Sequence, residues 1–241
     1  AEKECLVIKD MFTGITHAYP MSGRSSALVM ESIKFFTGRR KIQLAYSDNA
    51  PEFIKAMRML NILHDTATPG VPKTNGIAER TNQLIIGGTV TSLIAAGMPP
   101  CYWSYAAPCW CINYNTERIT GESNWDRLWK EPFHGQRFPF GCKVIFKPSD
   151  TRKLEDGVRH EKWDPKGKIG IFAGYKLHSG YGWKDEYLVW DQASFKHSDL
   201  RSVSTHLNQQ VGKPFVTRVC TLPEEGVVFP LKAHYERVNA E

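Results

Sequence analysis

Strand-type segments alternate with helical patterns along the N-terminal part of this chain, and the alternation restricts it to a mixed α/β fold. The segments Cys5–Ile8 and Ile15–Pro20 have β-type composition and flank the turn Phe12–Gly14. Residues 5–20 are therefore predicted to form a hairpin with Asp10 at its tip.

Two further strands and three helices are predicted to follow the hairpin. Ser25 or Ser26 is a suitable N-cap for the first helix, and Gly38 ends it. Apolar and polar residues alternate over Ile42–Ser47, which indicates a strand with Asp48 at its C-terminal end. The later elements are a helix over 51–60, a strand over 62–66 and a long helix over 75–97.

The sequence changes character after Pro132. Helices are predicted before it at 102–117 and 124–129. Strand-type segments dominate after it, at 143–146, 168–174, 186–191, 215–221 and 227–229. We therefore predict an α/β domain over residues 1–132 and a smaller β-rich module over 133–241. The 241 residues are 41% hydrophobic, which is enough apolar material for real cores.

The net charge of +6 favours a polyanionic partner, and the basic surplus is concentrated in the C-terminal part. Residues 143–176 carry nine Lys or Arg against five acids. A solvated loop of mixed charge and a nucleic-acid contact surface both fit this stretch. The candidate contacts in it are Lys143, Lys147, Lys166 and Lys168.

Other classes of protein find little support in the sequence. The six cysteines show neither Cys-x-x-Cys nor zinc-finger spacing, which predicts reduced, mostly buried thiols in an intracellular protein. No apolar run approaches the ~18 residues of a membrane span, and no secretory leader is recognisable. The start at Ala1, directly before a strand, leads us to expect a piece of a longer chain.

Asp48 and Glu79 are the candidate metal-binding carboxylates. In-line displacement at a phosphodiester uses two divalent cations about 3.5 to 4 Å apart, and Mg²⁺ prefers hard oxygen ligands. Asp48 would be held rigidly at a strand end, and Glu79 would lie near the start of the long helix. A plainer interpretation has Asp48 capping the next helix and Glu79 as a solvated helix residue.

Polar side chains around Glu79 are candidate nucleic-acid contacts. Asn82 and Gln83 follow Glu79 by three and four positions, so they share its helix face and can reach a bound phosphate or sugar. Lys73, Asn75 and Arg80 are further candidates in the same stretch.

The sequence motifs around both acids resemble those of the integrase of copia-type retrotransposons, a branch of the retroviral integrase family. Ser47–Phe53 is similar to that family's Ser-Asp-Asn-Gly-x-Glu-Phe, and Asn75–Asn82 is similar to its Asn-Gly-x-Ala-Glu-Arg-x-Asn. Weaker likenesses follow at Met98–Trp103, Phe140–Val144 and Gly170–Tyr175. The resemblance covers roughly residues 5–191. Two features depart from the family: Ala50 replaces a glycine, and the spacing of the two acids is shorter than usual.

The resemblance implies an RNase H-like mixed sheet flanked by helices, in a fragment of a Pol polyprotein. Asp48 and Glu79 would be the second and third catalytic acids, holding two Mg²⁺ (or Mn²⁺) ions in the complete enzyme. Asp10 matches the family's hairpin better than its catalytic strand, so the first acid is expected upstream of Ala1. Asp10 is kept as an alternative for this missing acid, which would complete the set of three, and Glu52 is a weaker substitute.

The same resemblance implies 3′-end processing and strand transfer of element DNA into target DNA. The expected partners are DNA and further copies of the chain on that DNA, in the nucleus, with no membrane and no small-molecule substrate. Without the first acid, the fragment alone is expected to be inactive. Two alternatives stay open: an RNase H-like nuclease, and a decayed or domesticated remnant that binds nucleic acid without catalysis.

Overall fold

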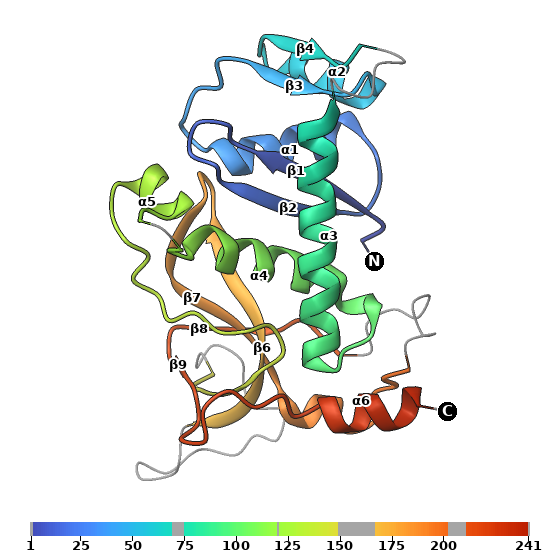
Figure 1. The fold of residues 1–241 in the computed structure, drawn as a ribbon, viewed down its shortest axis with the longest axis vertical. Coiled ribbons are helices and arrows are strands. Elements are labelled where there is room, and N and C mark those ends of the chain that lie inside the picture. Colours follow the sequence, from blue (N-terminus) through green and yellow to red (C-terminus); the bar gives the residue numbers. More distant parts are fainter. Residues whose placement is uncertain (1, 69–74, 120, 149–166, 202–210, 241) are drawn as a thin grey trace. The chain divides into compact units, whose positions relative to one another are not determined.

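The structure is a computed structural model that describes residues 2–68, 75–119, 121–148, 167–201 and 211–240. Its elements are shown in Figure 1. The chain forms two compact units, both built from discontinuous segments. Unit 1 comprises Ala1–Gly88, Tyr114–Phe133 and Leu177–Lys184, and unit 2 comprises Thr89–Asn113, His134–Lys176 and Asp185–Glu241. The predicted contiguous domains, 1–132 and 133–241, stay a prediction.

Unit 1 begins with the predicted hairpin. Strands β1 (Glu4–Lys9) and β2 (Thr16–Met21) pair antiparallel, with Leu6 opposite Tyr19. Helix α1 (Ser26–Thr37) follows, and the Ser25 hydroxyl caps it by accepting a hydrogen bond from the Leu28 amide. These three elements confirm the predictions made from β-type composition and capping residues.

A second, parallel strand pair completes the N-terminal part of unit 1. Strands β3 (Ala45–Ser47) and β4 (His64–Thr66) are joined by helix α2 (Pro51–Met59). Strand β3 starts at Ala45 rather than at Ile42, because β4 offers only three residues for pairing. Both strand pairs contribute to one core, whose buried members are Leu6, Met21, Val29, Ile33, Ala56 and Met57.

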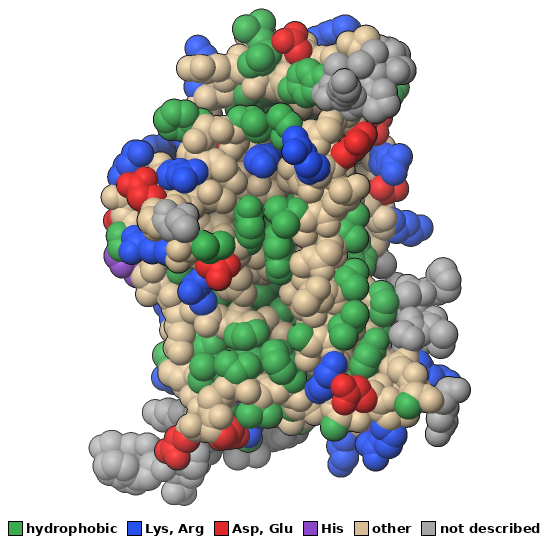
Figure 2. Space-filling model, in the orientation of Figure 1, with side chains coloured by type: hydrophobic (Ala, Val, Ile, Leu, Met, Phe, Trp, Pro, Cys, Tyr) green, Lys and Arg blue, Asp and Glu red, His purple; other side chains and the backbone are tan. Residues whose placement is uncertain are grey.

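Three helices occupy the middle of the chain: α3 (Gly76–Ala96), α4 (Trp103–Thr116) and α5 (Asn124–Trp129). Thr81, Ile85, Thr89 and Leu93 form a narrow buried line on α3 at four-residue spacing. The helix leaves Leu84, Ile86, Val90 and Ile94 exposed, and green hydrophobic side chains are visible along it in Figure 2.

Unit 2 is built around a five-stranded sheet in the order β8-β7-β6-β5-β9. The strands are β5 (Lys143–Phe146), β6 (Lys168–His178), β7 (Gly182–Asp191), β8 (Phe215–Thr217) and β9 (Cys220–Thr221). The buried Trp190 anchors its aromatic core, with Tyr102, Tyr105 and Phe140 packed edge-on against it. A mixed α/β region followed by an antiparallel C-terminal sheet confirms the predicted fold class.

The C-terminal predictions differ from the structure in detail, since the predicted strand over 215–221 is divided into β8 and β9. Residues 227–229 are not a strand, and Val228 contributes only a carbonyl that accepts from the Lys143 amide at 2.7 Å. Helix α6 (Lys232–Asn239) was not predicted, because it buries none of its own residues and so lacks an apolar stripe. Among the helices in the described ranges, none is long and apolar enough to cross a membrane.

The tip of the β6–β7 hairpin belongs to unit 1. Gly180 donates its amide to the Phe35 carbonyl at 2.7 Å, and its carbonyl accepts from Arg40 at 3.3 Å. The adjacent Tyr181 is fully buried with a positive φ of 64°, and its ring meets those of His17 and Phe36. Residues distant in sequence therefore complete the core of unit 1.

Candidate active site

Asp48 follows β3 directly and is exposed to solvent. One of its carboxylate oxygens accepts from the Ala50 amide at 3.2 Å. Helix α2 has Ala50 as its N-cap, with no side-chain capping bond. Asp48 is therefore not the N-cap of α2, although its bond to the Ala50 amide supports the start of that helix as the plainer interpretation expects, and its side chain stays exposed.

Strand β4 braces the segment that carries Asp48. The Ser47 hydroxyl donates to the Asp48 carbonyl at 2.7 Å and lies 2.9 Å from Nε2 of His64. Because that hydroxyl proton is already used, Nε2 of His64 is the donor to the Ser47 oxygen. The side-chain amide of Asn49 also donates to the Ala67 carbonyl at 2.7 Å. Sequence reasoning missed His64, since no local pattern links it to Ser47.

Glu79 lies in the first turn of α3 and is exposed. Its position suits a carboxylate, because the helix N-terminus carries partial positive charge. Asn82 and Gln83 are exposed further along the helix, and Arg80 is held by donating to the Gly76 carbonyl at 3.1 Å. A fourth candidate, Asn75, has a shielded side-chain oxygen without a hydrogen-bond partner among the described residues. Lys73 lies outside them.

Asp10 has a defined role in the turn after β1. One carboxylate oxygen accepts from the Phe12 amide at 2.9 Å, and the other accepts from the Thr13 hydroxyl at 2.8 Å. These bonds support a turn-forming role for Asp10 rather than metal binding. Glu52 lies in the first turn of α2, where its negative charge is favourable without any metal.

The chemistry of Asp48 and Glu79 suits a hard cation such as Mg²⁺. Across the described ranges, however, no group of three or more His, Cys, Asp or Glu side chains could hold a metal ion. The described residues therefore offer suitable donors but do not form a complete metal centre by themselves.

The basic candidates of unit 2 differ in their surroundings. Lys143 pairs with Glu225 at 2.7 Å and Lys168 pairs with Asp191 at 3.5 Å, both as partly exposed ion pairs. Lys147 is exposed and lines a hollow of about 400 Å³ together with Arg218 and Glu186. Lys166 lies outside the described residues.

The chain is similar in fold to a solved structure. It is similar to the catalytic core domain of BIV integrase over 50% of this chain and 81% of that one, with a TM-score of 0.40 and 18% identity. No protein-family model matches the chain.

In sequence, three curated relatives are retrovirus-related Pol polyproteins. Over 93% of this chain, the sequence is 27% identical to the polyprotein of transposon RE2 from Arabidopsis thaliana. Over 71% of this chain, it is 29% identical to the polyprotein of transposon RE1 from the same plant. It is 26% identical to that of transposon TNT 1-94 from Nicotiana tabacum over 76%. It spans 17%, 12% and 14% of these relatives respectively. The chain is thus a distant homologue of copia-type retrotransposon Pol polyproteins.

Proposed function

We propose that this chain is the integrase region of a retrotransposon Pol polyprotein, and that in the longer protein it processes the 3′ ends of element DNA and joins them to target DNA. The observation that carries the proposal is the placement of Asp48. Its exposed carboxylate directly follows strand β3, is not the N-cap of α2, and lies on a segment braced by His64 and by the Ala67 carbonyl.

In this proposal each group of side chains has a separate role. Asp48 and Glu79 would hold Mg²⁺ or Mn²⁺, which when bound activates an attacking hydroxyl and stabilises the leaving oxygen. Asn82 and Gln83, exposed on the same helix as Glu79, would orient the DNA strand. Arg80 would contact a phosphate, as would Lys147 in unit 2.

A third carboxylate is needed, and we place it on a strand upstream of this chain. In the described part of the chain, β1 pairs only with β2 and β3 pairs only with β4. Each two-stranded sheet therefore has an edge to which a further strand could be added, and both pairs pack against one core. A strand that pairs with β1 or β3 would complete an RNase H-like sheet and bring an acid close to Asp48. Asp10 is the alternative.

The proposal extends to the assembly. DNA joining brings two element ends to one target, so we infer homo-oligomers on DNA and a nuclear site of action. The basic side chains of residues 143–176 would bind phosphates with little sequence preference and strong salt dependence.

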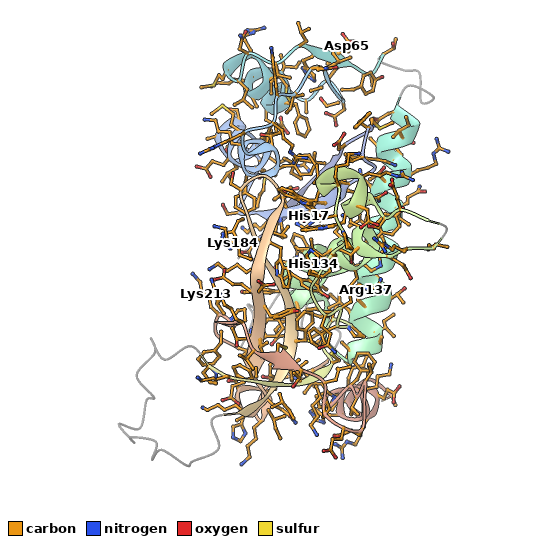
Figure 3. The ribbon with its side chains drawn as sticks, turned by 90° about the vertical axis from the view of Figure 1, so that its left-hand side faces the viewer. His17, Asp65, His134, Arg137, Lys184 and Lys213 are labelled. Atoms are coloured by element: carbon orange, nitrogen blue, oxygen red, sulfur yellow. The ribbon has the colours of Figure 1, made fainter. Side chains whose placement is uncertain are left out.

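Strand transfer by an upstream-extended protein tests this function. With labelled element-end DNA and plasmid target, the extended protein should give joined products in Mg²⁺. Asp48→Asn and Glu79→Gln should each lower the rate by about a hundredfold or more. Asp65→Asn is the matched control, because Asp65 is exposed on the neighbouring strand β4 (Figure 3).

Three outcomes would contradict parts of the proposal. Full activity of Asp48→Asn rejects the catalytic assignment. Activity of the short chain that survives Asp10→Asn rejects an upstream acid. Nicked strands without joined strands identify an RNase H-like nuclease instead.

A second candidate function is nucleic-acid binding without catalysis. It is favoured by the incomplete acid set among the described residues. A decayed or domesticated remnant would bind DNA and show no Mg²⁺-dependent product in either length of the protein. Its affinity for DNA would not change with Asp48→Asn beyond the effect of one charge.

A further inference from the structure

The turn between β1 and β2 displays two large apolar side chains to solvent. Met11 is 66% exposed, and Phe12 is 87% exposed, the highest value among the large hydrophobic side chains that the structure describes. Neither belongs to the buried core cluster of unit 1. Adjacent exposed apolar residues at the end of a tight turn suggest a contact surface.

This turn is held in one conformation. Besides the two bonds to the Asp10 carboxylate, the Asp10 amide donates to the Ile15 carbonyl and the Gly14 amide donates to the Asp10 carbonyl, both at 2.8 Å. Gly14 has a φ of +82° and packs against the side chain of Asn124, so the base of the turn is also fixed. A ligand that contacts Phe12 would therefore lose little free energy in ordering the backbone.

Exposed basic side chains lie on two segments next to the turn, at the end of β1 and after α1. Burial lowers the pKa of the Arg40 guanidinium, and the nearby Asp10 charge opposes that lowering, so Arg40 lies within electrostatic reach of the turn. Arg40 is fixed there, donating to the carbonyls of Phe36 and Gly180. Its neighbours Arg39 and Lys41 are exposed, as is Lys9 at the end of β1. Asp10, the acid within this set, already accepts two hydrogen bonds.

We propose that this turn binds DNA, with Phe12 stacked on an unpaired or unstacked base and Lys9, Arg39 and Lys41 holding the adjacent phosphates. The inference rests on the proposed function for its choice of DNA. An exposed aromatic ring near exposed Lys and Arg side chains suits a nucleic-acid strand that offers base faces and phosphates together. Kinked steps, where base stacking is partly lost, offer such bases in duplex DNA.

The test is binding of a fluorescein-labelled single-stranded oligonucleotide that carries 2-aminopurine. Phe12→Ala should weaken binding about 5- to 100-fold, the range for loss of one base–aromatic stack, and should abolish the quenching of 2-aminopurine. Phe12→Trp should retain both. Arg39→Gln with Lys41→Gln should weaken binding and reduce its salt dependence. Met59→Ala is the matched control, because Met59 is 61% exposed on α2.

The outcomes separate this inference from the proposed function. If the chain binds the oligonucleotide and Phe12→Ala changes neither affinity nor quenching, the turn is not a DNA contact, although integration stays possible. An equal loss in Met59→Ala also overturns it, because the effect would then be general. If the unaltered chain binds neither single-stranded nor blunt duplex DNA, this inference fails, and the proposed function is decided by strand transfer in the upstream-extended protein.

Discussion

At the scale of single residues, His17 is a buried group whose pKa lies far below its ordinary value. It is 3% exposed, lies edge-on to Tyr19 and Tyr181, and its Nδ1 is 3.2 Å from the Tyr181 hydroxyl. Figure 3 shows His17 surrounded by side chains. Burial lowers the pKa of His17 from 6.5 to about 3, so the folded protein holds it neutral.

The pH dependence of stability follows from that environment. Below pH 6.5 the unfolded chain protonates His17 and the folded chain does not, so stability falls from pH 6.5 down to about pH 3. At pH 5 the loss attributable to His17 should be about 2 kcal/mol. Urea unfolding at pH 7.5 and pH 5 measures it: His17→Gln should shrink the difference by that amount. His234→Gln, in exposed α6, should leave it unchanged.

His64 acts locally on the segment that carries Asp48. His64→Ala removes the partner of the Ser47 hydroxyl and should cost about 1 kcal/mol, the usual net value of one hydrogen bond. The amide of Ala67, which donates to the Ser47 carbonyl at 2.9 Å, should then exchange with solvent about fivefold faster. Hydrogen exchange followed by NMR measures this. Unchanged exchange in His64→Ala, or equal acceleration in His64→Asn, would contradict the bracing role.

At the scale of elements, most helices and strands follow from local signals. The Ser25 cap and Gly38 set the ends of α1, and Pro51 starts α2 at the position where proline fits best. Helix α6 escaped prediction because it has no buried residues of its own. Strand β3 was predicted three residues too long, because its length depends on the short partner β4.

The C-terminal end of α1 depends on a glycine for two reasons. Gly38 has a φ of +58°, and a Cβ there would lie 2.6 Å from the Cα of Gly180. Gly38→Ala should therefore cost about 2 to 3 kcal/mol, combining backbone strain with displacement of the hairpin tip. Gly121 has a φ of +103° and open space around it, so Gly121→Ala should show the strain alone, about 1 kcal/mol. Equal costs in denaturant unfolding would mean that the Gly180 contact contributes nothing.

At the scale of the whole molecule, a buried polar network ties distant segments into unit 1. The Asn115 side chain accepts from the Thr16 amide at 3.1 Å and donates to the Thr16 carbonyl at 2.6 Å and to the Tyr181 hydroxyl at 2.7 Å. Unsatisfied buried groups cost about 1 to 3 kcal/mol each, so this network favours one arrangement of the three segments. The third segment, which carries Tyr181, lies far beyond residue 132, the predicted end of the first domain.

This network makes the predicted domain border testable. Tyr181→Ala in the full chain should cost about 3 to 5 kcal/mol through the cavity it leaves. A chain that ends at residue 132 should lack a cooperative unfolding transition, because His17, Phe36 and Trp125 lose the Tyr181 ring that packs against each of them. Circular dichroism in urea compares the two. A sharp transition for residues 1–132 at the midpoint of the full chain would support the contiguous domain.

The sequence by itself determined the α/β class, the position of Asp48 at a strand end and of Glu79 in a helical first turn, and the resemblance that links both acids. Those features depend on residues close together along the chain. Only the tertiary structure decided that His64 braces Ser47 and that Tyr181 completes unit 1. These contacts join residues 17 and 164 positions apart, and side-chain packing over such separations leaves no periodic pattern in the sequence.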